Sequence, residues 1–169
     1  MSRLCVPFKT SFLDYPTNDH CISIYFTGCG FNCKGCQNKS LQDPSYDVWA
    51  QDMTAKDILD KLGSEYKRHR TKKVCLLGGD PLYKTNIDVT KQLLYINKIF
   101  EFCLYTGYDL EFIKENNIKG FTYLKTGQYF DQYSQLSEKN DKYYQLSSTN
   151  QKIYDKDFTL LSKNGKMEY

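Results

Sequence analysis

The chain has 169 residues, a mass of 19.8 kDa and a formal net charge of +3. Hydrophobic residues make up 40% of it, enough for a folded core, so we expect disorder only in a polar C-terminal tail from about residue 155. The small charge argues against a nucleic-acid partner, and no apolar run reaches the ~20 residues that a membrane-spanning helix needs. We therefore expect one domain over residues 1–169, located in a reducing cytoplasm.

The first predicted strand covers residues 21–26, after a turn-rich lead-in, because β-branched and aromatic residues dominate this run. A glycine-rich loop follows, with cysteines spaced C-x3-C-x2-C at Cys29, Cys33 and Cys36. Open α/β sheets and barrels bind ligands at the carboxyl ends of their strands. The cysteine loop is thus predicted to lie at the ligand-binding edge.

Helices and strands alternate along the rest of the chain, and each strand ends in a glycine-bearing loop, which is typical of a right-handed βα repeat. The predicted elements are a helix at 55–68, a strand at 74–77, a helix at 86–98, a strand at 100–105, a short helix after Asp109, a strand at 120–124 and edge strands at 143–146 and 153–154. A complete eight-fold barrel takes ~250 residues. We therefore expect an α/β fold with an incomplete, open barrel.

The number of clustered cysteines indicates the kind of metal site. Three thiolates on one loop suit an iron–sulfur cluster or a zinc ion, but a structural zinc site is closed by four protein ligands. No second C-x2-C and no pair of histidines follows at a suitable distance. An incompletely liganded four-iron cluster would leave one iron open for a substrate. The remaining cysteines, Cys5, Cys21, Cys75 and Cys103, are dispersed, and the last three lie in apolar runs typical of small buried side chains.

An alternative of a different class is a zinc-stabilised binding module, in which His20 or Cys21 completes the site and the basic run at residues 67–73 contacts nucleic acid. The simpler interpretation of that run is a solvated helix end, where cations complement the helix dipole. His20 and His69 are the only histidines, so hydrolytic catalysis has no candidate residues. We assign no catalytic residue beyond the metal cluster.

The cysteine motif together with Gly78-Gly79-Asp80-Pro81 resembles the radical S-adenosylmethionine enzymes. Within that superfamily, the chain is most similar to the small activating components of anaerobic (class III) ribonucleotide reductase. The further motifs that carry this resemblance are Asp14-Tyr15-Pro16, Thr27-Gly28-Cys29, Gly35-Cys36-Gln37-Asn38, Tyr105-Thr106-Gly107-Tyr108 and Ser147-Ser148-Thr149-Asn150-Gln151-Lys152-Ile153. The resemblance runs from about residue 8 to residue 154.

The resemblance implies a single activase domain with an open (β/α) barrel of the radical S-adenosylmethionine type. It implies a 4Fe-4S cluster held by Cys29, Cys33 and Cys36. It also implies S-adenosylmethionine bound near a set of loop residues, namely Gly35, Gly78, Gly79, Asp80 and Thr106. The adenine would pack against Phe31 or Tyr108.

The implied reaction is reductive cleavage of S-adenosylmethionine to a 5′-deoxyadenosyl radical, which then generates a glycyl radical on the large subunit of anaerobic ribonucleotide reductase. A flavodoxin or ferredoxin would supply the electron. Alternatives within the superfamily are activation of another glycyl-radical enzyme and a reaction on a small molecule.

One segment departs from the family pattern. Thr126-Gly127-Gln128 stands where these activators tend to have Asp-Gly-Lys. The segment therefore lacks a carboxylate and an ammonium that could orient the carboxylate end of the substrate or a bound cation.

Overall fold

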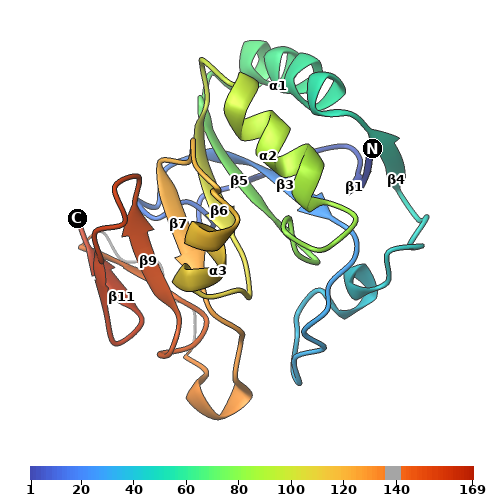
Figure 1. Cartoon of the computed structure of the whole chain (residues 1–169). Helices are drawn as coiled ribbons and strands as arrows, with labels where there is room; N and C mark the ends of the chain where they lie inside the picture. The colour runs from blue at the N-terminus through green and yellow to red at the C-terminus, as the bar shows by residue number, and fades with distance from the viewer. Residues whose placement is uncertain (136–141) are drawn as a thin grey trace.

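The computed structural model describes residues 1–135 and 142–169. Within them, a mixed eight-stranded sheet has the order β4-β1-β3-β5-β6-β7-β9, with β2 also paired to β3 (Figure 1). The strands are β1 Ser2–Cys5, β2 Lys9–Ser11, β3 Cys21–Phe26, β4 Ala50–Met53, β5 Lys73–Gly78, β6 Glu101–Tyr105, β7 Tyr123–Thr126 and β9 Lys152–Asp155. The four central strands β3, β5, β6 and β7 are parallel, and the outer strands pair antiparallel. The carboxyl ends of the four parallel strands therefore lie at the same edge of the sheet.

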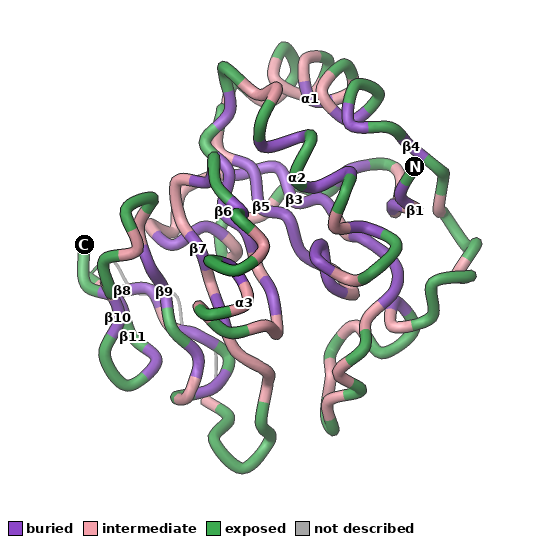
Figure 2. Tube along the Cα trace, in the orientation of Figure 1, coloured by how far each residue is buried: buried purple, intermediate pink, exposed green. Residues whose placement is uncertain are grey.

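Three helices pack on one face of the sheet: α1 Ala55–His69, α2 Ile87–Ile96 and α3 Leu110–Glu115. Alternate strand residues point toward them, as the two-residue period of a strand requires. Leu76 and Leu104 from neighbouring strands share a buried cluster with Leu62, Leu93 and Ile113 from the three helices. Figure 2 shows this burial as purple along most of β3 and β5.

The opposite face of the sheet carries a second cluster, which includes Tyr15 and the three cysteines Cys21, Cys75 and Cys103. All three cysteines are fully buried, and the sulfurs of Cys21 and Cys75 lie 3.8 Å apart. Their interpretation as small buried side chains is therefore confirmed. This face also presents Tyr105, whose hydroxyl donates to the carbonyl of Asp14 at 2.5 Å.

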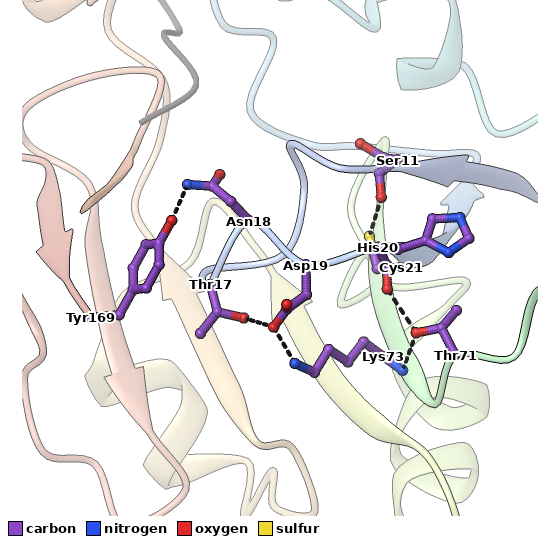
Figure 3. Close-up of polar contacts among 9 residues, drawn as sticks. All are labelled: Ser11, Thr17, Asn18, Asp19, His20, Cys21, Thr71, Lys73 and Tyr169. Carbon is purple, nitrogen blue, oxygen red and sulfur yellow. Dashed lines mark hydrogen bonds and ion pairs between the residues drawn. The ribbon is translucent and has the colours of Figure 1, made fainter. Parts of the chain in front are cut away.

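Polar contacts close the amino ends of β3 and β5 (Figure 3). Lys73 pairs with Asp19, and the Thr71 hydroxyl donates to the carbonyl of His20 at 2.7 Å. Asn18 donates to the hydroxyl of Tyr169 at 2.6 Å, which ties the C-terminus to the same region. The amino-end edge is thus filled by structural contacts.

A second sheet of three antiparallel strands has the order β10-β11-β8. Its strands are β8 Tyr143–Gln145, β10 Ser162–Lys163 and β11 Lys166–Glu168, and it buries Tyr144, Leu146 and Met167 together with Ile153 of β9. The polar tail expected from about residue 155 therefore contributes two short strands and one buried methionine. Two 3-10 helices, η1 Lys39–Gln42 and η2 Asp131–Tyr133, complete the elements.

Most of the predicted elements are present, but parts of the prediction were wrong. The tail from about residue 155, where we expected disorder, forms β10 and β11, and β4 has no counterpart among the predicted strands. The lead-in expected to consist of turns contains β1 and β2. The strand expected at 120–124 begins only at Tyr123, because Gly120 has φ +97° and packs so closely that a Cβ there would lie 2.8 Å from the Leu94 carbonyl oxygen. Residues 120–122 therefore form an irregular segment that leads into the strand.

The described strands form a mixed α/β arrangement with no closed barrel. Over the same residues, no helix combines the length and the apolar character that crossing a membrane would require.

We expect Leu76→Ala to lower the free energy of unfolding by about 2–5 kcal/mol, because the side chain is fully buried on a central strand and its removal leaves a cavity. Tyr95→Ala is the control, since that ring is 81% exposed on α2 and its loss should change stability by about 0.5 kcal/mol or less. Urea unfolding measures both. Similar losses for the two variants would contradict the assignment of the core.

Candidate metal centre

The cysteine loop begins directly after β3, at the carboxyl-end edge. Cys29, Cys33 and Cys36 are free, half-exposed thiols. Backbone hydrogen bonds fix the start of the loop: the Gly28 amide donates to the carbonyl of Leu41 at 2.7 Å, and the Cys29 amide donates to that of Gln42 at 3.0 Å. The 3-10 helix η1 therefore anchors the first cysteine.

The glycine pair after β5 packs against the base of this loop. The Gly79 amide donates to the carbonyl of Phe26, and the Asp80 amide donates to that of Gly28, both at 2.8 Å. A Cβ on Gly79 would lie 2.4 Å from the Gly28 carbonyl oxygen, and one on Gly78, which has φ +117°, would lie 2.5 Å from backbone atoms of Phe26. Close packing of two backbones thus requires both glycines.

Asp80 joins this pair of loops to the loop after β6. It is 2% exposed, and its carboxylate accepts hydrogen bonds from the amides of Leu82 and Gly107, each at 2.8 Å, and from the hydroxyl of Thr106 at 3.0 Å. Burial raises the pKa of Asp80 to about 6, although these donors and the charge of Lys125 oppose the rise. Asp80 and Thr106, both proposed ligand contacts, therefore also bind each other.

Phe31 connects the cysteine loop to the loop after β6. Its ring lies so close to Gly107 that a Cβ there would be 2.5 Å from it, and it meets the ring of Tyr108 edge-on with centroids 4.8 Å apart. Tyr108 in turn stacks on Phe112 at 3.8 Å. This aromatic row borders a pocket of about 530 Å³, whose wall also includes Gln128.

The middle of the cysteine loop faces the segment after β7. Gly35 has φ +76°, and a Cβ there would lie 2.9 Å from a carboxylate oxygen of Asp131. Between the cysteine loop and this segment lies a second pocket of about 420 Å³, lined by residues 31–34 and 128–132. Gly35 therefore lies beside the cysteines and faces Asp131, whereas Gly79 and Asp80 contact the base of the cysteine loop.

Lys125 is a site residue that the sequence did not predict. The two-residue period of β7 places it with Tyr123 on the face opposite the helices, and its ammonium lies 5.6 Å from the ring centroid of Tyr105. Burial lowers the pKa of Lys125 to about 8, opposed mainly by the nearby carboxylate of Asp80. The alternation of the strand, applied to the correct boundaries, is the signal that would have identified it.

The zinc alternative requires His20 or Cys21 to reach the three cysteines. Both lie at the amino end of β3, about 16 Å from the loop at the usual rise per residue. His20 stacks on Phe12, and Cys21 contacts Cys75. Over residues 1–135 and 142–169, no three His, Cys, Asp or Glu side chains are grouped so that they could hold one metal ion.

The donor set fits a four-iron cluster better than a single ion. Thiolates around one tetrahedral zinc stand ~3.8 Å apart, given a Zn–S distance of ~2.3 Å. In a four-iron cluster each thiolate binds a different iron, so the sulfurs stand farther apart. Three half-exposed free thiols on one anchored loop, with no fourth protein ligand grouped with them in the described residues, suit such a cluster by their number and chemistry. Cys29, Cys33 and Cys36 would hold the cluster.

We expect Gly79→Ala to destabilise the protein by more than about 2 kcal/mol, because the new methyl group would clash with two backbone carbonyl oxygens. Gly63→Ala is the matched control: it lies in α1 with open space around the added Cβ, and it should stabilise the protein by about 0.5–1 kcal/mol. Thermal and urea unfolding distinguish the two. A Gly79→Ala protein as stable as the parent would show that the two loops do not pack as described.

Comparisons with known proteins also indicate a four-iron cluster. A sequence profile described as the 4Fe-4S single cluster domain matches residues 20–154. The chain is 31% identical over 98 residues to the anaerobic ribonucleoside-triphosphate reductase-activating protein of Enterobacteria phage T4, covering 56% of this chain and 60% of that protein. It is 32% identical over 95 residues to the protein of the same name from Vibrio cholerae serotype O1, covering 52% and 58%.

The matched region thus spans about three fifths of the length of these curated relatives. The profile match covers most of the chain, including the cysteine loop, the glycine pair and strands β3 to β9. The chain belongs to the 4Fe-4S single cluster domain family.

Proposed function

We propose that this protein is an activating enzyme that reductively cleaves S-adenosylmethionine and generates a glycyl radical on anaerobic ribonucleotide reductase. The observation that carries this proposal is the cysteine loop packed on the glycine pair at the carboxyl ends of β3 and β5. The names of the two relatives, which are reductase-activating proteins, support the same reaction.

The cluster, when bound, supplies the electron that splits the sulfonium S–C bond. The residues of the chain bind and orient S-adenosylmethionine around it. In this proposal, the backbone of residues 78–80 holds the methionine end beside the cysteine loop, and Gly35 and Thr106 complete the binding region. The adenine occupies the pocket of about 530 Å³, where Phe31 and Tyr108 offer aromatic surface for stacking.

The sheet is, in this proposal, the wall of an open (β/α) barrel of the radical S-adenosylmethionine type. An open side suits a protein substrate, because a glycine loop of the large reductase subunit must approach the bound substrate, and docking would then exclude water. Phe130 lines the pocket beside the cysteine loop, and Tyr133 meets its ring edge-on; both rings are exposed and suited to contact that partner. The electron donor is a small one-electron carrier such as a flavodoxin or ferredoxin.

The cysteine assignment is tested by single substitutions. We expect Cys29→Ser, Cys33→Ser and Cys36→Ser each to abolish binding of iron and sulfide after anaerobic reconstitution, because each removes one thiolate ligand. Cys75→Ser and Cys75→Ala are the controls, since that thiol is fully buried on the far side of the sheet from the helices. Visible absorption and iron content measure the outcome, and equal loss at Cys75 would overturn the assignment.

The reaction is tested with the reconstituted protein, S-adenosylmethionine, a strong reductant and the large subunit of anaerobic ribonucleotide reductase. We expect 5′-deoxyadenosine to form together with a protein-centred radical signal on the large subunit. The Cys33→Ser protein should give neither. Cleavage that transfers a radical to a different glycyl-radical enzyme, but not to the reductase, would reject the proposed partner while leaving the class of chemistry intact.

A further inference from the structure

Lys125 is a partly buried cation, and over the described residues its ammonium forms no direct ion pair with Asp or Glu. It donates one hydrogen bond, of 3.3 Å, to the carbonyl of Gly127, and lies over the face of Tyr105. Within the described part of the chain, no carboxylate therefore bonds this ammonium directly, and Asp80, the carboxylate that acts on it electrostatically, is already held by other donors.

The fold gains little from this charge. A partly buried ammonium loses water and recovers only a long hydrogen bond and a cation–π contact. An apolar side chain of similar length, such as methionine, would pack against Tyr105 without that desolvation cost. The charge is therefore better explained by an anion that binds beside it.

The surroundings indicate what kind of anion fits. Asp80 lies near enough to interact electrostatically with Lys125, and its carboxylate is already held by donors from the loops after β5 and β6. The interior thus presents one fixed negative group and one fixed positive group beside the cysteine loop. This pair complements a zwitterion, and the amino acid end of S-adenosylmethionine is one.

Lys125 directly precedes Thr126-Gly127-Gln128, the segment that departs from the Asp-Gly-Lys pattern of the related activators. Gln128 replaces the lysine that the related activators tend to have, and its side-chain amide donates to the carbonyl of Phe31 at 3.4 Å. The Lys125 ammonium donates to the carbonyl of Gly127, the residue just before Gln128. An ammonium missing from position 128 is therefore supplied to the same loop from position 125.

We propose that Lys125 binds the carboxylate of S-adenosylmethionine and takes the place of the lysine absent at position 128. This inference rests on the proposed function. Lys125 is a substrate-binding residue in this account, and it takes no part in bond breaking. Its role is to fix the methionine end of the substrate through a charge-assisted hydrogen bond.

The test compares two ligands. Equilibrium dialysis measures the binding of S-adenosylmethionine and of its decarboxylated analogue to the reconstituted protein. We expect Lys125→Met to weaken binding of S-adenosylmethionine by about 10- to 100-fold, as for other hydrogen bonds to a charged group. Binding of the decarboxylated analogue should change less than about threefold, because it lacks the group that Lys125 contacts.

Two further variants sharpen the result. Lys125→Met combined with Gln128→Lys should recover most of the lost affinity, since it returns an ammonium to the loop. Lys91→Met is the control for net charge, because Lys91 is exposed on α2, and it should leave both affinities unchanged. We also expect the Lys125→Met protein to unfold at the same temperature as the parent or higher, which a purely structural lysine would not allow.

The inference is overturned if Lys125→Met binds S-adenosylmethionine as tightly as the parent, or if it weakens both ligands equally. Either result would leave the proposed function standing, provided that the parent protein binds and cleaves S-adenosylmethionine. If the parent protein binds neither ligand, the proposed function and the inference both fail.

Discussion

The contact between two backbones at the carboxyl ends of β3 and β5 organises the site. The amides of Gly79 and Asp80 donate to the carbonyls of Phe26 and Gly28, respectively. Neither Gly78 nor Gly79 has room for a side chain. These hydrogen bonds fix the start of the cysteine loop. A ligand loop that is already ordered loses less conformational entropy on binding, which favours assembly of a cluster at this edge.

Further links extend outward from that contact. Asp80 ties the glycine pair to Thr106 and Gly107, and Phe31 lies on Gly107 from the other side. The loops after β3, β5 and β6 therefore form one connected unit, and Gln128 adds the loop after β7 through its hydrogen bond to Phe31. Because the parallel strands bring these loops to the same edge, residues far apart in the sequence surround one site.

Much of this arrangement could be predicted from the sequence because single residues encode it. The spacing of the three cysteines can be read directly from the sequence. The start of α1 follows from a capping box, in which the side chains of Thr54 and Asp57 each accept a hydrogen bond from the other residue's backbone amide. The continuous apolar run of β5 indicated a strand buried on both faces, and the structure buries Leu76 against the helices and Cys75 on the opposite face.

Other features depend on tertiary contacts and were missed. Strands β1, β2 and β4 are three or four residues long and are defined by pairing with distant partners rather than by a local pattern. Phe121 was predicted to be part of a strand, but it is buried in the irregular segment that precedes β7. That shift in the boundary also hid Lys125, because the predicted strand ended at residue 124, whereas β7 continues to Thr126 and its alternation places Lys125 on the face opposite the helices.

The central claim is that three thiolates hold a four-iron cluster and leave one iron free for S-adenosylmethionine. Mössbauer spectroscopy of protein reconstituted with ⁵⁷Fe tests it most directly. We expect one of the four irons to change its spectrum when S-adenosylmethionine is added, while the other three keep theirs. A cluster whose irons all remain unchanged, or a protein that takes up no iron, would contradict the account.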